Sequence, residues 1–80
     1  MTETFEDIRK LDGEQIKQKL AGTDIQLIAK ALMGSSPMNN SYFKKLYPDA
    51  DIPGIQQSLF PAPMTDIEHA QQQILAIINA

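Results

Sequence analysis

Glycines and prolines divide this chain into short segments, and this division constrains its fold more than any other feature. The four glycines and five prolines separate runs in which apolar residues recur every three or four positions. That spacing is typical of one face of a helix, and no run alternates with a period of two over the length of a strand. The sequence therefore predicts an all-α fold, a compact single-domain bundle of five to six short helices.

Capping residues place the helices of the first half. Thr4 and Asp7 predict a short first helix over 5–10, and Asp12, accepting from the backbone of Gln15, predicts a second helix that runs toward residue 20. Gly22 suits a left-handed exit from that helix, and Thr23 with Gln26 has the pattern of a capping box. The third helix then carries one apolar face, made of Ile25, Ile28, Ala29 and Leu32.

A fourth helix follows Gly34, with Ser36 as its cap and Pro37 in its first turn. Its predicted inward stripe is Met38, Tyr42, Phe43 and Leu46, and its predicted solvent side is Asn39, Asn40, Lys44 and Lys45. Pro53 and Gly54 predict that a fifth helix is either interrupted or begins late, near Ile52 or Pro53, and only residues 55–60 have a clear helical pattern.

A capping box of Thr65 and Glu68 predicts that the last helix begins at Asp66 and continues nearly to Ala80. Its buried face is predicted to be Ile67, Ala70, Ile74, Ile77 and Ile78. With 80 residues, we expect one domain over residues 1–80.

The composition limits the cellular compartment and the kinds of partner that we expect. The absence of cysteine excludes a disulfide framework and fits a cytoplasmic protein. The longest apolar run, residues 74–78, is too short to span a bilayer, so we expect no membrane insertion. All seven bases lie within residues 1–45, whereas residues 46–80 hold four acids and no base. The net charge of −3 argues against a nucleic-acid partner.

No pattern of catalytic or metal-binding residues emerges. His69 is the single imidazole of the chain, and no nucleophile accompanies it. Asp49 and Asp51 resemble a fragment of a calcium loop, but Pro53 and Gly54 stand where further oxygen ligands are required. We therefore expect no enzyme activity, no metal and no cofactor.

A second interpretation is a small regulatory or nucleic-acid-associated helical protein. It would use Lys44, Lys45 and Tyr47, because bases interleaved with aromatic residues can bind single strands. The helical spacing instead favours a role for the neighbouring Tyr42 and Phe43 in the core. Binding that weakens with added salt would distinguish this interpretation from a protein-interaction module.

One set of apolar and capping residues follows a distinctive order along the chain, namely Phe5-Glu6-Asp7-Ile8, Leu11-Asp12, Ile16, Leu20, Asp24, Ile28, Ala31-Leu32-Met33-Gly34, Phe43 and Asp66-Ile67-Glu68-His69-Ala70-Gln71. This order resembles that of the C-terminal domain of FliG, the bacterial flagellar rotor switch protein. It implies a helical, non-enzymatic domain that meets the membrane-embedded stator through charged residues on one helix. It implies no cofactor.

The charged positions of that family fall on uncharged residues in this chain. A family Lys corresponds to Met33, an Arg to Ala50, and a pair of acids to Gln57 and Ser58, while a last Arg falls near Pro63 and Met64. We interpret the chain as a free-standing, divergent domain of this type that acts in protein–protein interaction. The expected partner-binding residues are Met33, Ile55, Gln56, Gln57, Ser58 and Leu59, and a flagellar component is one expected partner.

Overall fold

The computed structural model describes residues 2–80, and Met1 lies outside the described residues. Six helices follow one another in the order η1 (Phe5–Lys10, a 3-10 helix), α1 (Gly13–Lys19), α2 (Ile25–Leu32), α3 (Pro37–Leu46), α4 (Ile52–Leu59) and α5 (Met64–Ile78). Residues 2–80 contain no strand. The predicted all-α fold of five to six short helices is confirmed.

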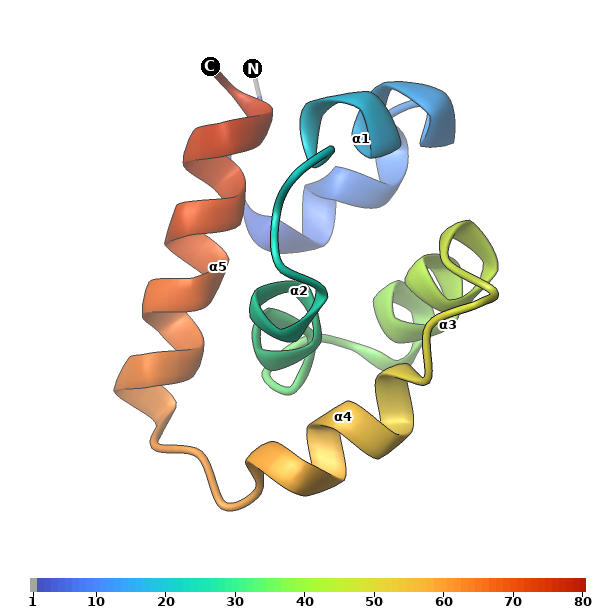
Figure 1. Cartoon of the computed structure of the whole chain (residues 1–80). Coiled ribbons are helices and arrows are strands. Elements are labelled where there is room, and N and C mark those ends of the chain that lie inside the picture. The colour runs from blue at the N-terminus through green and yellow to red at the C-terminus, as the bar shows by residue number, and fades with distance from the viewer. Residues whose placement is uncertain (1) are drawn as a thin grey trace.

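Helix α2 lies at the centre of the bundle, where α4 and α5 pack against it (Figure 1). Four of its eight residues are buried, namely Ile28, Ala29, Ala31 and Leu32. Two of these are alanines, which allow neighbouring helices to approach closely. The side chain of Gln71 on α5 donates a hydrogen bond of 2.9 Å to the carbonyl oxygen of Ala31. The apolar face predicted for this segment is therefore the centre of the core.

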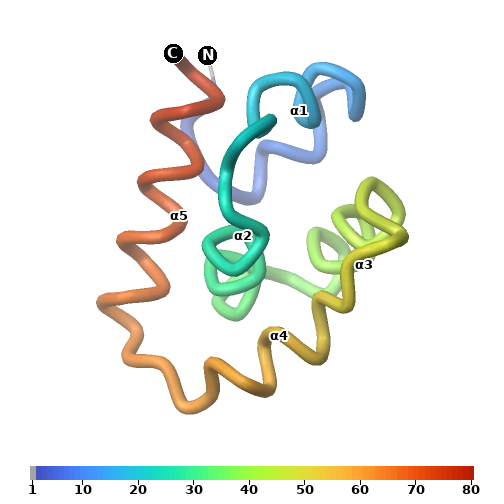
Figure 2. Tube along the Cα trace, viewed as in Figure 1, coloured from blue at the N-terminus to red at the C-terminus, as the bar shows by residue number. Residues whose placement is uncertain are grey.

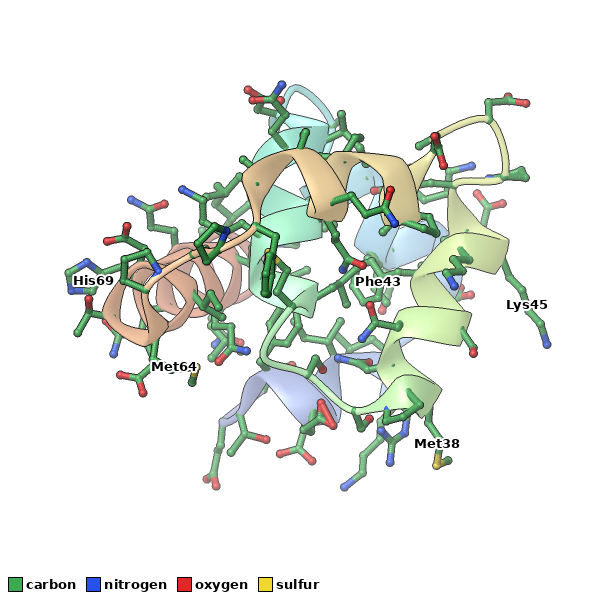
Figure 3. The ribbon with its side chains drawn as sticks, turned by 90° about the horizontal axis from the view of Figure 1, so that it is seen from below. Met38, Phe43, Lys45, Met64 and His69 are labelled. Atoms are coloured by element: carbon green, nitrogen blue, oxygen red, sulfur yellow. The ribbon has the colours of Figure 1, made fainter. Side chains whose placement is uncertain are left out.

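Phe43 of α3 anchors the other half of the core. It is fully buried, and Figure 3 shows it pointing into the molecule. Its ring stacks on Phe5, with the ring centroids 6.1 Å apart, and on Tyr47, with the centroids 6.5 Å apart. These aromatic contacts hold η1 and the end of α3 together.

The buried side of α3 differs from the prediction. Met38 is 65% exposed, whereas Asn39 is fully buried and Asn40 is half-buried. Asn39 donates hydrogen bonds to the Phe5 carbonyl oxygen and to Ser35 Oγ, at 3.4 and 2.8 Å. Since Asn39 and Phe43 are four residues apart, they share the face that packs against η1. The expected inward Met38 and solvent-facing Asn39 and Asn40 were wrong, because polar contacts with the 35–36 turn set the rotation of the helix.

Several predicted caps shift by one or two residues. Asp12 accepts from the backbone nitrogen of Glu14 rather than Gln15, and Asp24 rather than Thr23 caps α2. Helix α5 begins at Met64 without a side-chain cap, so the capping box of Thr65 and Glu68 is not formed. The carbonyl oxygen of Pro63 accepts the first helical hydrogen bonds instead, and Thr65 therefore already lies inside the helix.

Other local predictions are confirmed. Ser36 caps α3 with Pro37 in the first turn, and Gly22 has a φ of 86°. The buried residues of α5 are Ile67, Ala70, Ile74 and Ile78, and Ile77 is half-buried.

The two ends of the described chain lie side by side (Figure 2). The backbone nitrogen of Thr2 donates to Asn79 Oδ1 at 2.9 Å, and Asn79 Nδ2 donates to the Thr2 carbonyl oxygen at 2.7 Å. A radius of gyration of 11.5 Å is that of a compact chain of this length.

Candidate functional site

Helix α4 forms one rim of an open groove. Contacts in its first turn stabilise the start of this helix. Asp51 accepts a hydrogen bond of 3.2 Å from the backbone nitrogen of Gly54, and the buried Ile52 anchors the helix to the core. Pro53 stands in this first turn, where a missing N–H costs no helical hydrogen bond. Both Pro53 and Gly54 belong to α4, which begins at Ile52, so the predicted late start near Ile52 is confirmed and the alternative of an interruption is wrong.

The groove lies between α4, the end of α2 and the segment that leads into α5. It has a volume of about 500 Å³ and is lined by Met33, Pro53, Gln56, Gln57, Phe60, Pro61, Ala62 and Ile67. We call it the α4 groove. It brings together three of the six expected partner-binding residues, Met33, Gln56 and Gln57.

The other three expected residues do not line the α4 groove. Ile55 is half-buried and packs against the hydrophobic core. Ser58 is exposed, and its hydroxyl donates to the Ile55 carbonyl oxygen at 2.7 Å. Leu59 is half-buried at the end of α4. These residues flank the groove or support the helix that forms its rim.

Gln56 has its side-chain amide committed to the fold. Its Nε2 donates to the carbonyl oxygen of Ala29 on α2 and to Oδ1 of Asn40 on α3, each at 3.1 Å. One side chain thus connects three helices. In contrast, the neighbouring Gln57 is exposed on the rim of the α4 groove.

Phe60 lines the α4 groove and was not predicted as a site residue. It follows the last residue of α4 and is 73% exposed, although its backbone nitrogen is held by the Gln57 carbonyl oxygen at 3.3 Å. A signal for it is present in the sequence, because Pro61 and Pro63 prevent a helix from carrying this aromatic ring into the core. Met64, 59% exposed, begins the next helix.

The lining of the α4 groove has no ionisable side chain among residues 2–80. Apolar groups and the amides of Gln56 and Gln57 make up its surface. Such a lining favours contacts through buried apolar area over ion pairs.

The aromatic and basic residues of the second interpretation are arranged differently. Besides stacking on Phe43, Tyr47 has Lys17 Nζ 5.9 Å from its ring centroid. Burial raises the pKa of the Tyr47 hydroxyl. Lys44 and Lys45 are exposed, but the Tyr47 ring is occupied by packing and is not a free platform for a base.

The residues considered for catalysis or metal binding do not converge. His69 is exposed and lines a shallow groove with Lys30 and Asp66. Asp51 is engaged as the cap of α4. Within the described part of the chain, no group of three or more His, Cys, Asp or Glu residues could hold a metal ion. None of the described helices is long and apolar enough to cross a membrane.

Comparison with known proteins gives one match. The model of the FliG C-terminal domain matches residues 1–80, the whole chain. No curated protein and no solved structure matches. The match agrees with the all-α architecture, and the family is that of a flagellar motor component rather than of an enzyme. This chain therefore belongs to the family of FliG C-terminal domains, which are domains of the flagellar motor switch type.

Proposed function

We propose that this chain is a non-enzymatic interaction module that binds another protein of the flagellar motor through the α4 groove. The observation that carries the proposal is the groove itself, an open space of about 500 Å³ with an uncharged lining and with Phe60 at its edge. Family membership supports protein–protein contact within the motor. The setting that we propose is the cytoplasmic side of the motor, with no cofactor.

Phe60 is the expected anchor of the contact. Exposed aromatic rings carry a large share of the energy at protein interfaces, with truncation costing about 2 kcal/mol or more at a central position. Met33 and Gln57 provide the adjoining contacts across the groove. Ser58 and Leu59 border the surface, and Ile55 and Gln56 hold α4 in place.

Recognition at this surface differs from the charged contact implied by the resemblance to FliG. Residues Met33, Gln57 and Ser58 carry no charge, so they cannot supply ion pairs to a partner. Binding at the α4 groove should therefore depend only weakly on ionic strength, because screening acts on charges. The partner is expected to present an apolar segment.

Site-specific crosslinking in host cells tests the proposal. A photo-crosslinking residue at Gln57 should capture a motor protein, because this position faces the groove. The matched control places the same residue at Glu14, which is exposed on α1 and lies outside the groove. Equal capture of one protein from both positions, or of no motor protein from Gln57, would contradict the proposal.

A charge-introducing variant provides a second test. The substitutions Met33→Lys, Gln57→Glu and Ser58→Glu should weaken binding of the captured partner by about tenfold or more, because they place charges in an apolar contact. The control Gln15→Lys with Gln18→Glu adds one charge of each sign at exposed positions of α1, outside the groove. Full affinity in the groove variant would remove this surface from consideration.

A further inference from the structure

A second groove, on the opposite side of the bundle from α5, is basic. It lies between η1 and α3, has a volume of about 420 Å³, and is lined by Arg9, Pro37, Met38, Ser41, Tyr42 and Lys45. We call it the α3 groove. Its lining includes two cations and, within residues 2–80, no acid, whereas the α4 groove is uncharged.

The α3 groove combines apolar side chains with positive charge that is weakly paired at Arg9 and unpaired at Lys45. Met38 is 65% exposed, and Figure 3 shows Met38 and Lys45 projecting from the same side of the molecule. Arg9 is 3.9 Å from a carboxylate oxygen of Glu6, a weak ion pair at best. Lys45 takes part in no ion pair with another residue of the described chain. The groove is therefore suited to a helix that carries an apolar side chain and an acid.

The first turns of α5 have that character. Met64 is 59% exposed, and the exposed Glu68 lies four residues later, on the same face of the helix. Residues 46–80 contain four acids and no base, so no cation of this part of the chain competes for Glu68. Met64 lies on the side of the molecule away from Lys45 (Figure 3), which leaves both surfaces accessible at once.

We infer that the α3 groove binds the α5 face of a second copy of this chain. Met64 of one copy packs on Met38 and Tyr42 of the next, and Glu68 meets Lys45. On each helix the apolar residue and the charged residue are about one turn apart, Met64 and Glu68 on α5 and Tyr42 and Lys45 on α3. The apolar contact and the ion pair can therefore form at the same time.

The geometry of this pairing sets the form of the assembly. Because the two surfaces differ and lie on opposite sides, the contact is heterologous, and copies add head to tail. The apolar part is small and the ionic part is solvent-exposed, so the association is weak and falls as salt is added. The inference does not depend on the α4 groove, whose binding is expected to be insensitive to salt.

Sedimentation velocity over a range of protein concentrations, at low and at high ionic strength, tests the inference. The unmodified chain should associate at low salt and dissociate at high salt. The variants Lys45→Glu and Glu68→Lys should each weaken the association by about tenfold or more, because each juxtaposes like charges. A mixture of the two variants should associate again, since every contact between unlike copies then pairs opposite charges.

The double variant K45E/E68K gives the sharpest outcome. It keeps the net charge of −3 and exchanges the two charges, so the association should return. The control K45E/E14K has the same net charge but leaves the α5 face acidic, and it should stay monomeric. An unmodified chain that is monomeric at low salt overturns the inference. A double variant that fails to associate overturns it too.

Discussion

Neighbouring glutamines on α4 have opposite roles. Gln56 donates two hydrogen bonds of 3.1 Å to α2 and α3, whereas Gln57 is exposed on the rim of the α4 groove. Nothing in the local sequence separates them, because each is a polar residue on a short amphipathic helix. The difference arises from which of them faces the Ala29 carbonyl and the Asn40 amide.

Substitution by leucine separates the two roles. Gln56→Leu should lower the free energy of unfolding by about 1–2 kcal/mol, since it leaves buried polar partners without a donor. Gln57→Leu should change it by less than about 0.5 kcal/mol, as is usual for exposed positions. Urea denaturation followed by circular dichroism measures both. Equal losses for the two variants would contradict the assignment.

The carboxyl group of Glu6 makes the free energy of unfolding depend on pH. Burial on its own would raise the pKa of the Glu6 carboxyl, but hydrogen bonds from Ser35 and Ser36 outweigh this effect and hold the pKa below its usual value. A depressed folded-state pKa contributes stability above the unfolded-state pKa, and this stability is lost as the pH falls through the folded-state value.

The variant Glu6→Gln tests this contribution. At neutral pH its free energy of unfolding should be lower than that of the unmodified chain by about 1 kcal/mol or less. The expected loss is small because the carboxylate is partly exposed and solvent weakens its contacts. The difference should shrink as the pH falls below 4.5, the ordinary pKa of a glutamate, toward the lower pKa of the folded state. Thermal unfolding at a series of pH values measures it, and a difference that stays constant with pH would exclude an ionic origin.

At the scale of helices, most elements could be predicted from the sequence, but several starts could not. Ser36 and Pro37 located the start of α3, because a capping hydroxyl and a proline act locally. The start of α5 at Met64 could not be found in this way, because the Pro63 carbonyl replaces a side-chain cap. The rotation of α3 depends on Asn39 and its contacts 34 residues away in the chain, which no local pattern contains.

Close packing between α2 and α5 gives a prediction at this scale. A Cβ atom at Gly34 would come within 2.7 Å of Ile67 Cγ2, a branched and buried side chain. Gly34→Ala should therefore cost about 1–3 kcal/mol of stability. In the control Gly13→Ala, the nearest atom is Leu46 Cδ2 at 2.6 Å, the movable end of a side chain. Its loss should be smaller, and chemical denaturation of both variants checks the order.

For the whole molecule, the candidate site was only partly predictable. Met33 and Gln57 were expected through the resemblance to FliG, and the structure places both on one groove. Phe60 was missed, because its exposure depends on where α4 ends and how the chain turns toward α5. The periodicity of apolar residues predicts which side chains pack into the core, but it cannot predict which apolar side chains remain exposed on the surface.

The charge and the packing of Tyr47 predict that the protein does not bind nucleic acid. The net charge is −3, and the Tyr47 ring is engaged by Phe43 and Lys17. Fluorescence titration with single-stranded DNA and RNA should show no binding at low or at high ionic strength. Binding that weakens with salt would instead support a nucleic-acid role for Lys44 and Lys45.

The hydrogen bonds between Thr2 and Asn79 hold the two ends of the described chain together. The order of the helices along the sequence can therefore be changed while their arrangement in space is kept. A circular permutant that joins these ends by a short linker and opens in the exposed Pro48-Asp49 turn should retain its helical circular dichroism spectrum, because no helix is cut. The same proximity would let the bundle be inserted as a cassette into a loop of a carrier protein while leaving the carrier's own backbone path almost undisturbed.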